Sequence, residues 1–343
     1  MTTFSRAAVG RLLAVIAGVL AISLVVGAAA IPIDSSAVPP TSSGRWFNAA
    51  PMNHPRSEVG VGLLDGKIYV VGGFLAGRVP TNIVEVYDPA TDRWEDRAPL
   101  PFIGTHVTVV GVDGKLYTIG GSLGTSLTDT TAAVYAYDPT TDQWTPRSPL
   151  PVARGAGAAA VIDGKIYFAG GLPVEREFDF TVYDPQADSW EVLPPMPTRR
   201  NHLTAAAING LFYAIGGRTG PGVPNVVNTD ALEVFDPTTR LWSTRTPLPK
   251  PRGSVASAVV NGCLYVFNGE MNPDSPTGVF ADNDVYDPRT DRWESLEPVP
   301  IPVHGTGAVA IGNRIYIPGG GTRLGGGSAA PVHQVYETDR SCE

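Results

Sequence analysis

Short apolar runs separated by turn residues recur along this chain and follow one plan. A run of small residues, such as 155–162 (GAGAAAVI), leads into an Asp-Gly or Asn-Gly turn, and a second run, such as 67–73 (KIYVVGG), ends in paired glycines. Asp-Gly supplies the positive φ of a tight hairpin, so these runs are predicted to be paired strands, the first small enough for a crowded inner position. A third strand ends at Tyr-Asp-Pro, and a tryptophan seven residues after that tyrosine opens a fourth. The pattern predicts four-stranded units.

The unit is repeated six times with a period near 50 residues. Its tryptophans and its glycine pairs are independent markers, yet both series show the same spacings, between 46 and 52 residues. The tryptophans are Trp46, Trp94, Trp144, Trp190, Trp242 and Trp293, and the pairs begin at Gly72, Gly120, Gly170, Gly216, Asn268 and Gly319. Strand-built repeats of this length are typical of propeller blades, so the predicted fold class is all-β, a six-bladed β-propeller of four-stranded blades.

The last unit predicts how the ring closes. Tyr336-Glu337-Thr338 replaces its Tyr-Asp-Pro, and Glu343 stands where the other units place a tryptophan. Trp46 opens a fourth-strand motif with no first three strands before it. We therefore expect residues 45–52 to complete the last blade, which removes exposed sheet edges.

Composition narrows the function classes. The 39 glycines and 32 prolines are spread along the chain, which suits many short strands and argues against long helices. The net charge is −8, with no basic run after the N-terminal segment, so we expect no nucleic-acid partner and no adhesion to an anionic membrane surface. We expect a monomer.

The N-terminal segment predicts export. Arg6 and Arg11 are followed by an uncharged run over 12–33 with small residues near its end, which describes a signal peptide over 1–30. The run is also long enough to span a bilayer, so an uncleaved anchor through residues 12–31 is the alternative. Either interpretation places the body outside the cytoplasm, secreted or anchored. A Pro/Ser linker is expected over 31–44, and the propeller over 45–343.

The recurring residues resemble the Kelch repeat. The resemblance rests on the proline-arginine before the first strand, the turn, the tyrosine, the Gly-Gly and the Tyr-Asp-Pro with its spaced tryptophan, and it covers roughly 45–343. It implies one of several functions, because Kelch propellers include protein-binding domains, copper radical oxidases similar to galactose oxidase, and periplasmic sialic-acid mutarotases. An exported propeller looks most like the bacterial periplasmic members.

The resemblance also implies a ligand-binding site at the mouth of the axial channel. In Kelch propellers the contacting positions lie two residues after the motif arginine and just after the glycine pair. Here the first position gives Glu58, His106, Ala156, His202, Ser254 and Gly305, and the second gives Phe74, Ser122, Leu172, Arg218, Glu270 and Gly321. We predict binding through Glu58, Phe74, His106, His202, Arg218, Ser254 and Glu270; the alternative is that these are solvated loop residues. The motif arginines, Arg56, Arg154, Arg200 and Arg252, are predicted to be structural and to bond a neighbouring loop or blade.

No cofactor and no metal site are expected. His54 and His304 stand in different registers from His106 and His202, which lie two blades apart, so a common ion is not expected. The oxidase pattern of copper-binding tyrosines and histidines with a crosslinked cysteine has no match. Acidic turns such as 88–92 are ordinary turn chemistry rather than calcium loops. Whether the two cysteines, Cys263 and Cys342, form a disulfide is left open.

The expected function is binding of a protein or glycan through the channel mouth. The alternative is a sugar-modifying enzyme resembling the sialic-acid mutarotases, in which Glu58 or Glu270 would move a proton while Arg218 held a substrate carboxylate. A purely structural role in the cell envelope is a third possibility. The residues do not identify the partner or the sugar.

Overall fold

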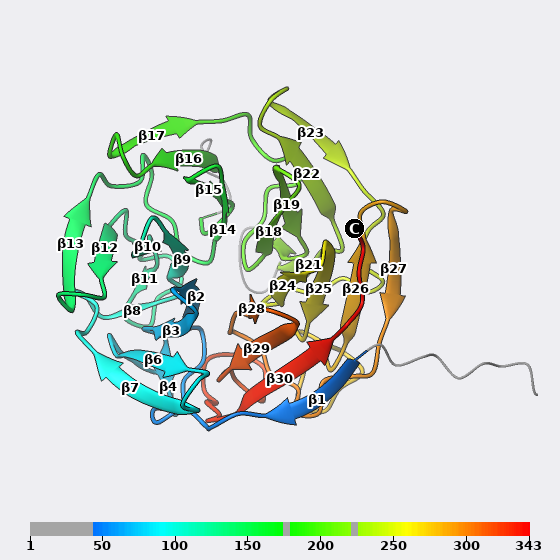
Figure 1. The fold of residues 1–343 in the computed structure, drawn as a ribbon, viewed down its shortest axis with the longest axis horizontal. Coiled ribbons are helices and arrows are strands. Elements are labelled where there is room, and N and C mark those ends of the chain that lie inside the picture. Colours follow the sequence, from blue (N-terminus) through cyan, green and yellow to red (C-terminus); the bar gives the residue numbers. More distant parts are fainter. Residues whose placement is uncertain (1–43, 174–178, 221–225) are drawn as a thin grey trace, which may run out of the picture. The chain divides into compact units, whose positions relative to one another are not determined.

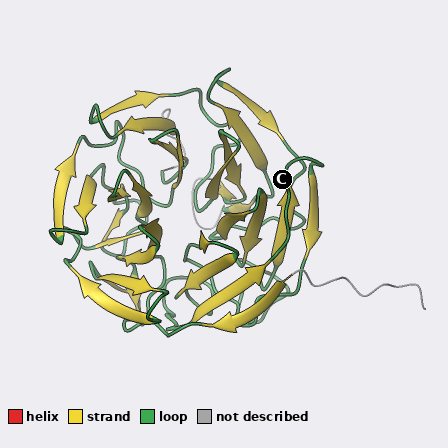
Figure 2. Cartoon of the chain, in the orientation of Figure 1, coloured by secondary structure: helices red, strands yellow, loops and turns green. Residues whose placement is uncertain are grey.

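The computed structural model describes residues 44–173, 179–220 and 226–343, and within these ranges it contains strands and no helix. Six four-stranded antiparallel sheets stand as blades around a central axis (Figure 1), joined only by loops and turns (Figure 2). The all-β, six-bladed prediction is confirmed. The predicted signal peptide and the linker, except for Gly44, lie outside the described residues. Within the described part, no helix is long and apolar enough to cross a membrane.

Each blade runs from an inner to an outer strand in chain order, except the last. Blades one to three consist of β2 (Gly60–Leu64), β3 (Lys67–Val71), β6 (Val84–Asp88) and β7 (Arg93–Arg97); β9 (Thr108–Val112), β10 (Lys115–Ile119), β12 (Val134–Asp138) and β13 (Gln143–Arg147); and β14 (Ala158–Ile162), β15 (Lys165–Ala169), β16 (Phe180–Asp184) and β17 (Ser189–Val192). Blades four to six consist of β18 (Thr204–Ile208), β19 (Leu211–Ile215), β22 (Leu232–Asp236) and β23 (Leu241–Thr244); β24 (Ala256–Val260), β25 (Cys263–Phe267), β26 (Asn283–Asp287) and β27 (Arg292–Ser295); and β28 (Val309–Ile311), β29 (Arg314–Pro318), β30 (His333–Thr338) and β1 (Gly44–Asn48). Three two-stranded sheets lie in the loops at one end: β4 (Phe74–Leu75) with β5 (Val79–Pro80), β8 (Gly104–Thr105) with β11 (Ser122–Leu123), and β20 (Arg218–Thr219) with β21 (Val227–Asn228).

The inner strands need small residues because they touch one another around the axis. Each inner strand contacts the next one around the ring, in the order β2, β9, β14, β18, β24 and β28, and β28 contacts β2. A Cβ on Gly60 would meet the carbonyl oxygen of Val107, and one on Gly111 would meet that of Leu63. Larger side chains at these positions would push neighbouring blades apart, which explains the small first run of each repeat.

The Tyr-Asp-Pro turn and its tryptophan attach each blade to the one before it. In the first blade the Tyr87 hydroxyl donates to Asp92 Oδ1 (2.7 Å), and the same oxygen accepts the Ala50 N–H (2.7 Å). Trp94 Nε1 donates to the Ala50 carbonyl oxygen (2.8 Å). The arrangement recurs in later blades, with Trp144 donating to Ala98. The acidic turns therefore belong to the framework, as the sequence predicted.

The last blade is assembled from both ends of the propeller. Strand β1 pairs with β30, with Trp46 opposite Tyr336, so the predicted closure is confirmed. Cys263, at the start of β25, forms a disulfide with Cys342, which follows β30, and this answers the question that the sequence left open. The bond joins blade five to blade six.

The hydrophobic core is divided among the spaces between neighbouring blades. One such cluster contains Leu64 and Tyr69 of blade one with Leu116 and Tyr137 of blade two, and equivalent clusters follow around the ring. Each blade thus buries both faces against its neighbours.

The motif arginines are structural, as predicted, and they bond loop carbonyl groups and strands of their own blade rather than the neighbouring blade. Arg200 donates to the Ala214 carbonyl oxygen (2.9 Å) and pairs with Glu233 (2.5 Å), both within its own blade. The other three likewise bond their own second and third strands, Arg56 through Glu85, Arg154 through Thr181 and Arg252 through Asp284. The Arg56 guanidinium thus bonds the Gly72 and Ile83 carbonyl oxygens where the second and third strands of its blade adjoin the loop.

Candidate functional site

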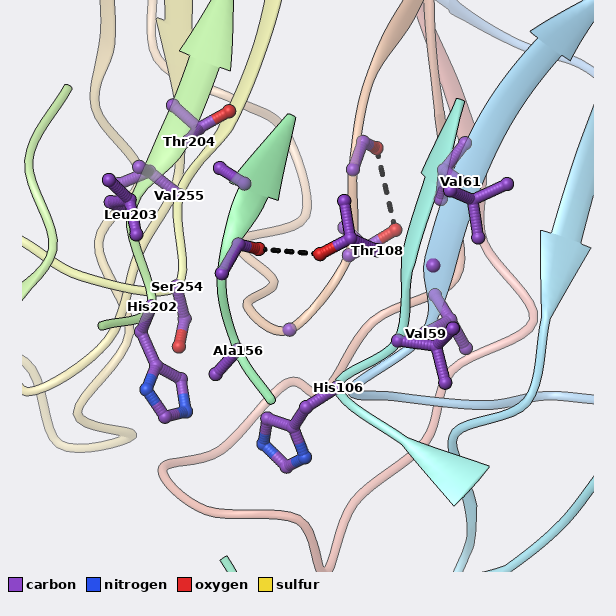
Figure 3. A pocket seen from close by; sticks show the side chains of 18 of the residues that line it. Val59, Val61, His106, Thr108, Ala156, His202, Leu203, Thr204, Ser254 and Val255 are labelled. Carbon is purple, nitrogen blue, oxygen red and sulfur yellow. Dashed lines mark hydrogen bonds between the residues drawn. The ribbon is translucent and has the colours of Figure 1, made fainter. Parts of the chain in front are cut away.

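The axis of the propeller holds a cavity of about 180 Å³. Its walls are the inner strands, and one of its ends is formed by the residues that precede them, including Glu58, His106 and His202. Figure 3 shows the His106 and His202 rings at one end of this cavity, with Ala156 and Ser254 between the strands that carry them. We call this end, bordered by the loops before the first strands and after the glycine pairs, the channel mouth.

Six equivalent residues, one from each blade, surround the axis at this end. They are Glu58, His106, Ala156, His202, Ser254 and Gly305, which we call the axial belt. All six have positive φ, between 52° and 62°, a conformation that costs a non-glycine residue about 1 kcal/mol or more. Strained positions of this kind concentrate at binding and active sites, so the belt is the first candidate for function.

Backbone hydrogen bonds hold the belt together. The N–H of His106 donates to Glu58 O (2.9 Å), that of Ala156 to His106 O (3.0 Å), that of His202 to Ala156 O (2.8 Å) and that of Ser254 to His202 O (2.8 Å). These bonds cross from blade to blade and compensate for the strained φ angles. The backbone of the belt is therefore fixed from blade two to blade five relative to blade one.

A network of charged side chains fills the channel mouth. Glu58 Oε2 lies 3.2 Å from His106 Nε2. His304 Nδ1 lies 3.4 Å from Glu58 Oε1 and 3.4 Å from Glu270 Oε2. Arg218 pairs with Glu270, whose Oε1 also accepts the Ser254 hydroxyl (2.9 Å). Segments from blades one, two, four, five and six thus meet in one network.

Burial and charge set the ionisation of this network. Burial alone would raise the pKa of Glu58, but His106 and His304 hold it well below its usual value. Burial would lower the pKa of His304, yet the Glu58 and Glu270 carboxylates raise it to about 9. Burial and the Arg218 charge lower the pKa of His202. The pKa of Glu270 is likewise lowered against the effect of burial, by His304 and Arg218. At neutral pH the two carboxylates are therefore ionised, His304 is protonated and His202 is neutral.

Each of the three histidines has one ring nitrogen fixed by a neighbour. His106 Nδ1 lies 2.9 Å from the Thr105 hydroxyl, and His202 Nδ1 is hydrogen-bonded to Asn201 Oδ1. His304 Nε2 donates to the Arg323 carbonyl oxygen (2.7 Å). The remaining ring nitrogens face the network, so the ring orientations are determined from outside it.

The seven residues predicted for ligand binding all lie in or beside this network. Phe74 stands at its edge, with its ring 6.1 Å from that of His106. Each of the seven is less than a tenth exposed, so the alternative that they are solvated loop residues is wrong. The resemblance to Kelch propellers indicated these positions, and the blades differ in the residues they place there. Their contact with a ligand stays a prediction.

His304 is the residue that sequence reasoning missed. It was set aside because its register differs from that of His106 and His202, yet its fully buried ring lies between two carboxylates. The blade-six belt residue is Gly305, and a Cβ there would meet the Glu58 carboxyl group at 2.7 Å. The sequence did contain one signal for His304: it directly precedes Gly305, the one belt position without a side chain.

The argument that His106 and His202 are too far apart to act together is also wrong. Their ring centroids are 5.1 Å apart, although they stand on blades two and four. Blades that are well separated at the rim converge at the axis of a ring. Sequence separation in blades is therefore a poor guide to distance at the belt.

Comparisons with known proteins agree with this fold. The KLHDC2/KLHL20/DRC7 Kelch-repeats domain matches residues 106–320, and the Kelch motif matches residues 55–101. Kelch-like protein terF of Aspergillus terreus (strain NIH 2624 / FGSC A1156) is 38% identical over 117 residues, which is 34% of this chain and 25% of that protein. The Rab9 effector protein with kelch motifs of Homo sapiens is 36% identical over 100 residues, 27% of each chain. The chain therefore matches about a quarter of the length of these relatives.

A solved structure, described as "Structure of YjhT", superposes on most of the propeller. It gives a TM-score of 0.68 and covers 84% of this chain and 96% of its own, at 18% sequence identity. At that identity the likeness concerns the fold alone.

Proposed function

The chain belongs to the Kelch-repeat family, and from that premise we propose that it is an exported binding module that holds a protein partner at its channel mouth. Kelch propellers commonly mediate protein interactions, which supports a protein partner over other ligand classes. A glycan is the alternative ligand. We propose that the module acts as a monomer.

One observation carries the choice of surface. Seven large hydrophobic side chains are exposed in the described part of the chain, and five of them lie on the loops and short strands at the channel mouth: Val79 of β5, Ile103, Val227 of β21, Ile301 and Leu324. Apolar side chains gathered around a polar, rigid centre are typical of protein interaction surfaces. The other two, Val192 and Leu241, lie on outer strands.

The dimensions of the cavity favour a partner that covers the mouth over a small ligand that enters it. About 180 Å³ is less than the roughly 300–1,000 Å³ of pockets that enclose drug-sized ligands. A partner resting on the apolar rim can place one side chain or a chain end in this space. The buried network then offers it fixed, paired charges.

The enzyme alternative receives less support from the geometry. A sugar-modifying mechanism requires Arg218 to hold a substrate carboxylate, but Arg218 is already paired with Glu270 and neither lines the cavity. A carboxylate that moves protons works best with a pKa near the operating pH. The pKa values of Glu58 and Glu270 are both lowered, because positively charged neighbours outweigh their burial.

An extracytoplasmic site of action is proposed from two features. The basic start and uncharged run of the N-terminal segment describe a targeting sequence. The disulfide between Cys263 and Cys342 is a kind of bond that persists in oxidising compartments. Cell fractionation with an antibody to the propeller tests this location, and protein found only in the cytoplasm would refute it.

Partner capture with matched surface variants tests the binding surface. The double variant Val79→Asp/Leu324→Asp places charges on the apolar rim, whereas Val192→Asp/Leu241→Asp places the same charges on outer strands. We expect the rim variant to recover proteins from the extracytoplasmic fraction at least about 10-fold less well than wild type, equivalent to about 1.4 kcal/mol. The outer-strand variant should match wild type.

The same variants separate the alternatives. Equal recovery by both variants would exclude the channel mouth as the docking surface. Retention of glycans on an array, lost in the rim variant and accompanied by no protein partner, would favour the glycan alternative. Acceleration of sugar anomer interconversion, followed by NMR, would favour the enzyme.

A further inference from the structure

Three side chains of the axial network are arranged as ligands of one metal ion. One oxygen of Glu58 and one ring nitrogen each of His106 and His202 lie within 4.8 Å of one another. All three residues belong to the axial belt and line the cavity (Figure 3 labels both histidines). We propose that Glu58, His106 and His202 bind one divalent transition-metal ion of the zinc class at the channel mouth.

The separations suit such an ion. Ligands about 2.0–2.1 Å from zinc in a tetrahedral shell lie roughly 3.3–3.4 Å from one another. The Glu58 Oε2 to His106 Nε2 distance is 3.2 Å, close to that value. These two ligand atoms are therefore about as far apart as two ligands of one zinc ion. His202, inside the 4.8 Å limit, completes the shell by an approach of up to about 1.4 Å.

The outer contacts of the histidines point the same way. Metal-binding histidines commonly donate their second ring N–H to a protein acceptor, which fixes the ring and leaves the other nitrogen for the ion. The Asn201 side-chain amide donates to the Arg218 carbonyl oxygen (3.4 Å), so its Oδ1 is the acceptor for His202 Nδ1. His202 Nε2 is then left with a lone pair. The Thr105 hydroxyl lies 2.9 Å from His106 Nδ1 and fixes that ring nitrogen, so His106 Nε2 is the nitrogen that faces Glu58.

A buried histidine, His304, lies beside the other oxygen of the Glu58 carboxylate. His304 Nδ1 is fully buried and has no hydrogen-bond partner among the described residues, although Glu58 Oε1 and Glu270 Oε2 are each 3.4 Å away. A metal ion on Glu58 Oε2 would draw this carboxylate into a single position, with His304 beside its other oxygen. His304 is therefore assigned as a positioning residue.

A second possible group, Glu58 with Glu270 and His304, is less suitable for an ion. Glu270 already accepts from Arg218, from the Ser254 hydroxyl and from the Gly325 N–H (3.0 Å). Glu270 and His304 do not line the cavity. The Glu58–His106–His202 group has an open side toward the cavity, where a water molecule or a donor atom from a partner can supply the fourth ligand.

The ligand types define the class of ion. Two imidazoles and one carboxylate suit zinc, iron, cobalt or nickel, whereas calcium and magnesium require oxygen ligands. The inference does not depend on partner binding, because the three ligands come from this chain alone. A failure of partner capture leaves it standing.

The test uses the full chain, stripped with a chelator and titrated with Zn²⁺ by calorimetry and with Co²⁺ by visible absorption. We expect one ion per chain with a dissociation constant of micromolar or below, a tetrahedral Co²⁺ spectrum, and no heat from Mg²⁺. His106→Gln and His202→Gln should each weaken Zn²⁺ binding at least about 100-fold. His54 belongs to a separate possible group, with Glu85 and Asp96, so His54→Gln tests that group and should bind like wild type if the ion is held in the channel.

Two further measurements keep the proposal falsifiable if a ligand variant fails to fold. X-ray absorption on the wild-type zinc protein should show scattering from two imidazoles. Thr105→Val, which removes only the contact to His106, should weaken binding about 10-fold. Absence of stoichiometric Zn²⁺ or Co²⁺ binding by the wild type, or its loss in His54→Gln with retention in His106→Gln, would overturn the proposal.

Discussion

At the scale of the residue, the axial belt places the same strained backbone conformation side by side around the axis. Five non-glycine residues adopt positive φ there, and four blade-to-blade hydrogen bonds hold them in that conformation. The framework repeats in every blade, so it is the belt side chains that distinguish this propeller. Blade three contributes Ala156 and blade six Gly305, which leaves room for the larger Glu58, His106 and His202.

The motif arginines provide a paired test of buried charge. Arg200→Met would leave Glu233 buried without its cation, and we expect a loss of about 3–5 kcal/mol in the free energy of unfolding. Arg154→Met would remove hydrogen bonds to the neutral Thr181 hydroxyl and the Gly170 carbonyl, and we expect a loss of no more than about 2 kcal/mol. Urea unfolding measures both. Equal losses would contradict the role assigned to the buried carboxylate.

At the scale of the element, each blade depends on its neighbours for burial and for attachment. Tryptophans near the start of the fourth strands donate hydrogen bonds to the preceding blade. The hydrophobic core is shared across blade boundaries. Blades five and six have one additional link, the disulfide. It connects residues 79 apart in sequence, spanning β26, β27, β28, β29 and β30.

Removing the disulfide should lower stability substantially. Closing a loop of this length restricts the unfolded chain by about 4 kcal/mol. We expect the double variant Cys263→Ala/Cys342→Ala to lose about that much in urea unfolding. Wild type treated with reductant should approach the variant, and the variant itself should not respond to reductant. A midpoint shared by oxidised wild type and the variant would show that the bond contributes nothing.

The elements were the most predictable part of this protein. Asp-Gly turns, glycine pairs and spaced tryptophans are local, chemically specific signals, and six copies make register errors visible. The network at the mouth was predictable only in part. Glu58 and Glu270 stood out because blades differ there, but His304 was missed because its contacts come from blades one and five, and no local pattern reports such convergence. The sequence could not decide whether the motif arginines bond a loop or the neighbouring blade, because a long side chain can reach in several directions.

At the scale of the whole molecule, the joint between the last and first blades is sensitive to acid. His333 on β30 packs its ring against Tyr87 (4.5 Å between centroids) and Trp94 (5.2 Å) of blade one. Its Nδ1 lies 3.2 Å from the Ala50 carbonyl oxygen, and its buried Nε2 has no partner among the described residues. Burial lowers the pKa of His333 to about 4, only partly offset by Ala50 and the Asp92 charge.

This shift predicts a loss of stability on acidification. An unfolded histidine titrates near pH 6.5, so between about pH 6.5 and 4 the unfolded state binds more protons, and the free energy of unfolding falls as the pH falls. From pH 7 to pH 5 His333 should contribute a loss of about 2 kcal/mol. His333→Gln should remove that part of the pH dependence, and His54→Gln, at an exposed site, should not. Equal acid sensitivity in all three proteins would refute this role.

The blade that closes the ring also sets the order of events during synthesis. Residues that pair across β1 and β30, such as Arg45 and Glu337, are 292 positions apart. When the ribosome has made β1, almost the whole propeller remains to be translated, so β1 must wait as an unpaired edge while the blades between are produced. Strand β30 is made last of the paired strands, so β1 is already present when β30 appears. The pairing of β1 with β30 therefore comes after all five intervening blades have been made.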